Sequence, residues 1–263
     1  MDVYLAMMRA SLRAQASYRR SFLLEVFGRG WIALLELAAV IALMTQATEL
    51  AGFGRDEVIY LYGAVTAALG IAELLTDGLN DMPELVRLGT FDGVLVRPAP
   101  ALIQVMARQC RPYHLGRVAQ GALAMGFGLW ATGFAPSPDR LAMVVLQLVS
   151  ATAVFAGIFV AEAGTCVFAV ASGELFNAFS FGGQELAKFP MPIYGRWLRL
   201  VFLGLVPVGF VSYFPSLVVL DHPDPMGWPA WTPWATPLVA GLFLALTLRW
   251  WSFAVDRYRS TGS

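Results

Sequence analysis

Residues 81–98 read DMPELVRLGTFDGVLVRP, a polar and turn-rich stretch set between long apolar runs. Hydrophobic residues make up 58% of the 263 residues and charged residues 14%, whereas soluble domains have roughly 45–50% apolar and about 25% charged residues. The apolar excess is concentrated in runs near the roughly 20 residues that cross a bilayer core. The composition therefore predicts an all-α polytopic membrane protein in which residues 81–98 form a loop outside the bilayer.

Six apolar segments are long enough to span a membrane, and one of them, 141–171, is longer than the bilayer thickness requires. They are residues 23–47, 58–79, 118–134, 141–171, 198–220 and 234–255. Within 198–220, Pro207 and Pro215 interrupt the apolar run. A membrane tolerates such breaks where neighbouring groups or water satisfy the freed carbonyls. We therefore expect six transmembrane helices, of which the fifth is broken.

The segments that flank these runs have their own patterns. Residues 1–21 place apolar residues and arginines on opposite faces of a helix, which is typical of an amphipathic helix lying in the membrane interface. No small-residue cleavage site follows, so we expect no removable signal peptide. Within 176–197 the pair Gly182-Gly183, the charged residues Glu185 and Lys188, and the prolines at 190 and 192 exclude a simple span and predict an interfacial segment or elbow.

The basic residues predict the orientation in the membrane. If the N-terminus is inside, 16 of the 18 basic residues fall on inner segments, and only Arg55 and Arg140 lie outside. This distribution follows the positive-inside rule. We therefore expect both termini, and the loop after the second span, to be cytoplasmic.

Small residues recur at four-residue spacing in three of the expected spans. The groups are Gly63 and Ala67; Ala153, Gly157 and Ala161; Gly241 and Ala245. Such spacing permits close approach of helices, either within one chain or between two.

Motifs for catalysis or ATP binding are missing from the sequence. The phosphate-binding loop GxxxxGK[ST] needs a lysine, and the only lysine, Lys188, lies in LAKFP. His114 and His222 both fall in loops, which does not favour a zinc enzyme or an intramembrane protease. Cys110 and Cys166 are too far apart for a CxxC or zinc pattern. We expect no catalytic residue, metal site or cofactor in this chain.

Four carboxylates lie inside the expected spans: Glu36, Glu73, Asp77 and Glu162. Charge at that depth is costly, and such residues usually face the interior of a helix bundle. One hypothesis is a pathway for protons or cations. The other is that Glu73 and Asp77 lie near the cytoplasmic end of their span and that Glu36 pairs with a neighbour, although the spans offer no obvious basic partner.

Two blocks of sequence resemble a known family. The first, RLGTFDGVLVRPAPALIQVMARQ, has a Gly, two residues, an Asp, leucines and Arg-Pro; the second, FPMPIYGRWLRLVFLGLVPVGFVSYFPSLVVL, has an aromatic-Pro, Ile-Tyr, a basic stretch, a membrane proline and a Tyr-x-Pro. With the six spans and the basic N-terminal helix, these blocks resemble the permease subunit of a bacterial ABC-2-type transporter. The matching positions are Gly89, Asp92, Leu95, Arg97, Pro98, Phe189, Pro190, Ile193, Tyr194, Arg199, Pro207, Tyr213 and Pro215.

The resemblance implies an ATP-driven exporter in the bacterial cytoplasmic membrane. Two permeases, identical or different, would pair with two ATPase subunits that bind ATP and Mg²⁺, and the cargo would be a hydrophobic or amphipathic compound such as a drug, a lipid or a lipid-linked glycan. Membrane lipid is an expected partner and nucleic acid is not.

The resemblance also implies that residues 81–117 form a cytoplasmic coupling region that contacts the ATPase. Its sequence agrees with a short helix, because Asp81 or Asn80 can cap it, Pro83 suits its first turn and Gly89 can end it. The expected ATPase-coupling residues are Glu84, Arg87, Gly89, Asp92 and Arg97.

The broken fifth span suggests an outer gate on the translocation path. The candidate residues for the path are Glu36, Phe202, Phe210, Tyr213 and Phe214. Aromatic residues at helical spacing are also typical of packing, so this second interpretation stays open.

Two other functional classes compete with the ABC-2 interpretation. An ion-coupled secondary transporter or channel would use the four intramembrane carboxylates and would work without an ATPase. A structural membrane scaffold would support no flux at all. Dependence on an ATPase partner distinguishes the ABC-2 interpretation from the other two, and flux distinguishes a transporter from a scaffold.

Overall fold

The computed structural model describes residues 19–46, 49–109, 111–168 and 182–259. The expected interfacial helix at 1–21 lies almost wholly outside the described residues, as do residues 176–181 of the expected elbow. Helices dominate the rest, as the composition predicts. Five of them are long: α2 (Arg19–Gln46), α3 (Arg55–Thr76), α7 (His114–Ala131), α8 (Pro138–Cys166) and α12 (Thr236–Asp256).

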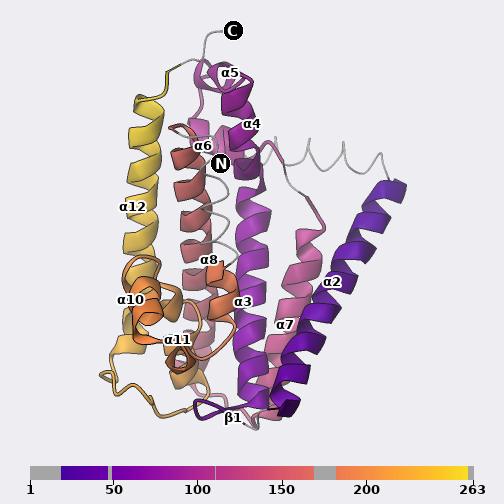
Figure 1. The fold of residues 1–263 in the computed structure, drawn as a ribbon, viewed down its shortest axis with the longest axis vertical. Coiled ribbons are helices and arrows are strands. Elements are labelled where there is room, and N and C mark those ends of the chain that lie inside the picture. Colours follow the sequence, from indigo (N-terminus) through magenta and orange to yellow (C-terminus); the bar gives the residue numbers. More distant parts are fainter. Residues whose placement is uncertain (1–18, 47–48, 110, 169–181, 260–263) are drawn as a thin grey trace.

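These helices form a bundle with two distinct ends (Figure 1). One end carries a compact group of short helices that we call the cap: η1 (Asp77–Asp81), α4 (Met82–Arg87), α5 (Asp92–Leu95) and α6 (Ala101–Met106). The opposite end carries the hairpin of β1 (Glu49–Leu50) and β2 (Phe53–Gly54), which joins α2 to α3. Since α2 runs into this hairpin, its first turn lies toward the cap end, where α12 also finishes.

Glycines allow α3 and α7 to touch backbone to backbone. A Cβ atom at Gly63 would overlap the backbone of Met125, and one at Gly121 would overlap the backbone of Ala67. Side chains larger than hydrogen at these positions would force the helices apart. The small-residue spacing at Gly63 and Ala67 is therefore used inside one chain.

The expected fifth span is broken, and the structure locates the break. The segment comprises α10 (Arg196–Gly204), η4 (Val208–Phe210) and α11 (Tyr213–Val219), and its two halves meet at a bend of 74°. Pro207 lies at this bend, as predicted. The prediction that Pro215 also interrupts the span is wrong, because Pro215 lies in the first turn of α11, where its missing N–H would have had no helical partner.

Three described helices are long and apolar enough to cross a membrane, and the bent pair could provide a fourth. They occupy Arg55–Arg87, Pro138–Cys166 and Thr232–Asp256, the last including η5 (Thr232–Ala235). The apolar part of α2 that is described, Leu35–Thr45, is short, and α7 is interrupted by polar residues such as Arg117 and Gln120. The helical membrane class is confirmed, while the count of six spans and their orientation remain predictions.

Apolar side chains of the described residues pack in separate clusters along the bundle. At the β1–β2 end, residues of α3, α8, α10 and α11 pack into one large cluster. At the other end, a second cluster joins the cap to α8 and α12. The cap is thus packed onto the ends of two long helices.

Candidate functional site

The cap is built around α4, whose limits match the sequence signals. Pro83 occupies its first turn, and Gly89 follows its C-cap with φ of +67°, a left-handed conformation that glycine adopts without strain. Asp81 precedes α4, but the prediction that its side chain caps the helix is wrong. Its carboxylate instead accepts a hydrogen bond from Gln109 Nε2 at 2.8 Å. Asp81 therefore ties α4 to the chain beyond α6.

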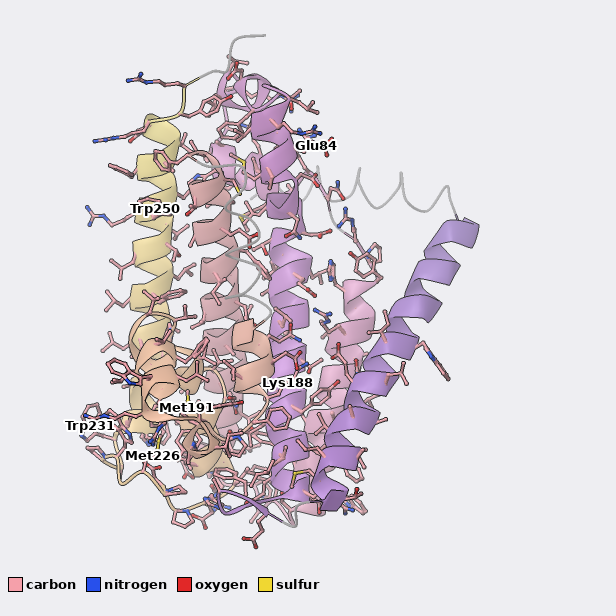
Figure 2. The ribbon with its side chains drawn as sticks, viewed as in Figure 1. Glu84, Lys188, Met191, Met226, Trp231 and Trp250 are labelled. Carbon is pink, nitrogen blue, oxygen red and sulfur yellow. The ribbon has the colours of Figure 1, made fainter. Side chains whose placement is uncertain are left out.

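The outer surface of the cap mixes charged and apolar side chains. Glu84 and Arg87 are exposed and lie 4.0 Å apart, one turn from each other on α4. The exposed side chains of Leu88 and Val96 lie on the same short segment as Arg97. Figure 2 shows Glu84 at this end of the bundle. Four of the predicted coupling residues, Glu84, Arg87, Gly89 and Arg97, thus belong to one short, surface-facing segment.

The fifth predicted coupling residue, Asp92, is half-buried at the start of α5. It lies near Tyr258, which follows α12. Burial, and then the nearby Asp92 carboxylate, raise the pKa of the Tyr258 phenol above its ordinary value. Asp92 therefore contributes to the attachment of the cap to α12 as well as to its outer face.

The underside of the cap is apolar and contacts α12 through aromatic rings. Phe91 is fully buried, and its ring meets those of Trp251 and Tyr258 edge to face at centroid distances of 6.4 and 5.1 Å. Met82, Leu85 and Val94 belong to the same cluster. Such packing makes displacement of the cap without displacement of α12 costly.

A buried glutamine fixes the conformation of the chain between α5 and α6. Gln104 on α6 donates from Nε2 to the backbone oxygens of Val94 and Ala99, at 3.1 and 2.7 Å. Beside it, Gly78 approaches α6 so closely that a Cβ would overlap the oxygen of Val105. Sequence reasoning missed both residues, and the only signal was a polar side chain on an otherwise apolar helical stretch.

Behind the cap, Glu73 and Asp77 meet basic residues from the start of α7 and the loop before it. Glu73 accepts from Arg117 Nη1 at 2.6 Å, and its other oxygen lies 2.9 Å from His114 Nδ1. Asp77 Oδ1 lies 3.3 Å from His114 Nε2 and 3.4 Å from Arg111 Nη1. All three basic partners lie outside the expected spans, and they reach this pair because the chain folds back after the cap.

Glu36 also has a basic partner, which could not be predicted because the two residues lie far apart in the sequence. Lys188 Nζ lies 3.3 Å from Glu36 and 2.5 Å from Glu185, and it lies 5.4 Å from the centre of the Tyr62 ring. Its side chain is 2% exposed. Figure 2 places Lys188 beside α3 in the half of the bundle away from the cap. Glu162, the fourth carboxylate, is half-buried on α8.

The aromatic candidates for the path gather around the broken segment. Phe202, Tyr213 and Phe214 are buried, and Phe210 is half-buried with its ring 4.7 Å from that of Phe214. They belong to the core of the bundle. Phe214 also borders a pocket of about 360 Å³ at the end opposite the cap, where Arg140 pairs with Asp221 at 2.6 Å. Glu36 lies apart from this pocket and is not among the residues that line it.

A bundle of long apolar helices with a mixed-charge helical cap at one end defines a multi-pass membrane protein. A family model described as "ABC-2 family transporter protein" matches residues 31–262, so the chain belongs to the ABC-2 transporter family as a permease. No curated protein and no solved structure matches the chain. The resemblance identified from the two sequence blocks is thereby confirmed.

Proposed function

We propose that this chain is the transmembrane subunit of an ATP-driven exporter and that the cap receives mechanical work from a separate ATPase. Membership of the ABC-2 family supports the transporter class. ATP and Mg²⁺ would be bound by the partner, since the sequence offers no phosphate-binding loop. A second permease, identical or different, would complete the transporter.

The observation that carries this proposal is the two-sided construction of the cap. Its outer side presents Glu84, Arg87 and Arg97 with exposed Leu88, a mixture suited to a protein groove. Its inner side is packed by Phe91 against α12. A displacement of the outer side by the ATPase would therefore move α12 as well.

The placement of the cap in the cytoplasm is part of the proposal. It is supported by the charge distribution, because the arginines at 87, 97, 108, 111 and 117 all lie in or near the cap. With the cap inside, the broken segment and the pocket beside Phe214 lie toward the outer side of the bacterial cytoplasmic membrane. There the aromatic cluster would serve as the outer gate for a hydrophobic or amphipathic cargo such as a drug, a lipid or a lipid-linked glycan.

Charge reversal on the cap tests the proposal. Glu84→Lys combined with Arg87→Glu changes the surface without touching the packed side, since both side chains are 66% exposed. We expect normal membrane insertion but loss of ATPase stimulation and of ATP-dependent transport when the chain is expressed with its genomic neighbours. Arg55→Glu, an exposed substitution at the opposite end, is the matched control and should leave coupling intact.

Two results would refute the proposal. One is unchanged coupling in the reversed variant. The other is transport that proceeds without any ATPase and collapses with an uncoupler, which would favour the ion-coupled class. The pairing of Glu73 with Arg117 and of Glu36 with Lys188 argues against that class, because both carboxylates already have cationic partners.

A further inference from the structure

The outward face of α12 bears an open groove close to the cap. Its volume is about 800 Å³, and the side chains that line it lie between 246 and 256, among them Arg249, Trp250, Phe253 and Asp256. Figure 2 shows Trp250 on α12 in the half of the bundle that ends near Glu84. The groove is distinct from the coupling surface, which lies on α4 and α5.

Aromatic and cationic groups are held in order along this groove. The rings of Trp250 and Phe253 stack at 5.6 Å with an interplanar angle of 26°. Trp250 Nε1 donates to Thr165 Oγ1 on α8 at 3.1 Å, which fixes the indole. The guanidinium of Arg257 lies over the Phe253 ring at 4.5 Å. One wall of the groove therefore has a defined shape before any ligand binds.

The charged and apolar side chains of α12 are arranged in the same order as the charged headgroup and apolar chains of a lipid. Arg249 and Asp256 line the groove, and Arg257 lies beside it over the ring of Phe253, so two guanidinium groups and one carboxylate belong to this part of α12. Toward the bundle centre the exposed side chains of Leu246 and Leu242 continue on the same helix. A positive region beside stacked aromatics, above an apolar strip, is the arrangement that holds a headgroup at the interface and an acyl chain below it.

We propose that this groove binds an anionic phospholipid from the leaflet on the cap side. Arg249 and Arg257 attract the phosphate-bearing headgroup, Trp250 and Phe253 line the level of the glycerol, and an acyl chain lies over Leu246. A second copy of the chain fits the groove less well, because its own α12 would bring two further arginines against these two. The proposal requires a membrane but no ATPase, so it does not depend on the proposed function.

Quenching of tryptophan fluorescence by brominated lipid tests the proposal. The full chain is placed in nanodiscs containing brominated phosphatidylglycerol or brominated phosphatidylcholine at equal mole fractions, and the Trp250 signal is the difference between the wild type and Trp250→Phe. We expect a preference for the anionic lipid of roughly fivefold, the scale of one arginine at a charged membrane surface. The preference should vanish in Arg249→Gln/Arg257→Gln, which removes the arginine that lines the groove and the one that lies over Phe253. It should persist in Arg259→Gln, an exposed arginine that is not among the residues lining the groove.

Three outcomes would overturn the proposal. Equal quenching by the two lipids would mean that only ordinary boundary lipid contacts α12. Retention of the preference in the double arginine variant would place the selectivity elsewhere. Absence of quenching by either lipid, with disulfide-linked dimers of Leu246→Cys, would show that a second copy covers the face. If Trp250→Phe fails to fold, lipid-dependent total fluorescence of the two arginine variants provides the same comparison.

Discussion

Lys188 lies 3.3 Å from Glu36 and thereby joins the segment that leads into α10 to helix α2, 152 residues earlier in the chain. The lysine side chain is 2% exposed, whereas the carboxylates of Glu36 and Glu185 are 35% and 60% exposed. The buried ammonium group is thus paired with two carboxylates that are more exposed than it is. The ammonium group also lies 5.4 Å from the centre of the Tyr62 ring.

The first prediction is that the two carboxylates around Lys188 substitute for each other. Glu36→Gln and Glu185→Gln should each cost about 1 kcal/mol or less of stability, because the remaining carboxylate still pairs with the lysine and both positions are partly exposed. The double variant leaves a buried cation unpaired and should cost about 3 kcal/mol or more. Thermal unfolding in detergent measures both effects.

A third substitution provides the control for this prediction. Adding Lys188→Met to the double variant removes the unpaired charge and should restore most of the lost stability. Strictly additive effects of the two glutamines, or no recovery with methionine, would contradict the paired arrangement.

The second prediction concerns the contact between α3 and α7. Gly121→Val should destabilise the protein strongly, because its side chain would overlap the backbone of Ala67 and push the helices apart. Gly126 lies on the same helix, and a methyl group there would meet no neighbouring side chain of the described residues within 4 Å. Gly126→Ala should therefore be neutral or stabilise by up to about 1 kcal/mol through helix propensity. The midpoints of thermal unfolding should separate the two variants, and similar midpoints would show that the helices do not touch at Gly121.

The third prediction is that the cap separates from α12 when Phe91 is truncated. Phe91→Ala removes the ring that meets Trp251 and Tyr258 and should cost about 3–5 kcal/mol of local stability. We expect proteases to cut within 81–117 much faster, with the amount of protein in the membrane little changed. Phe127→Ala, at an exposed aromatic on α7, is the control. An unchanged cleavage pattern in Phe91→Ala would argue against the packed interface.

The fourth prediction distinguishes a structural from an ion-conducting role for Glu73. Glu73→Arg should lower stability, because it places a cation beside Arg117 and His114. The exchanged pair Glu73→Arg/Arg117→Glu should recover part of the loss, since the opposite charges again face each other. Thermal stability is the measurement. If the exchange restores stability but transport stays absent, Glu73 has a role that its charge alone does not explain.

Local signals in the sequence predicted where two helical segments end. The break at Pro207 and the end of α4 at Gly89 follow from properties of those residues, namely a missing N–H and freedom to adopt positive φ. Pro215 was misjudged because a proline disrupts a helix only beyond the first turn, and the sequence does not show where that turn begins.

Partners of polar groups were much harder to predict. The cation that pairs with Glu36 lies 152 residues away in the sequence. Arg117, which pairs with Glu73, lies 44 residues away, after the whole of the cap. No periodicity in the sequence brings such groups together, since their meeting depends on how helices associate. The same holds for Gln104, whose role depends on two backbone oxygens exposed by a turn.

The sequence by itself determined the membrane class, the break at Pro207, the end of α4 at Gly89, and the family, because hydrophobicity, backbone preferences and short motifs are properties of neighbouring residues. Only the tertiary structure decided that α3 and α7 touch through glycine, that Phe91 joins the cap to α12, and that Lys188 is buried between two carboxylates. These features arise from packing between segments distant in the chain, where steric fit and charge neutralisation act only after the helices have come together.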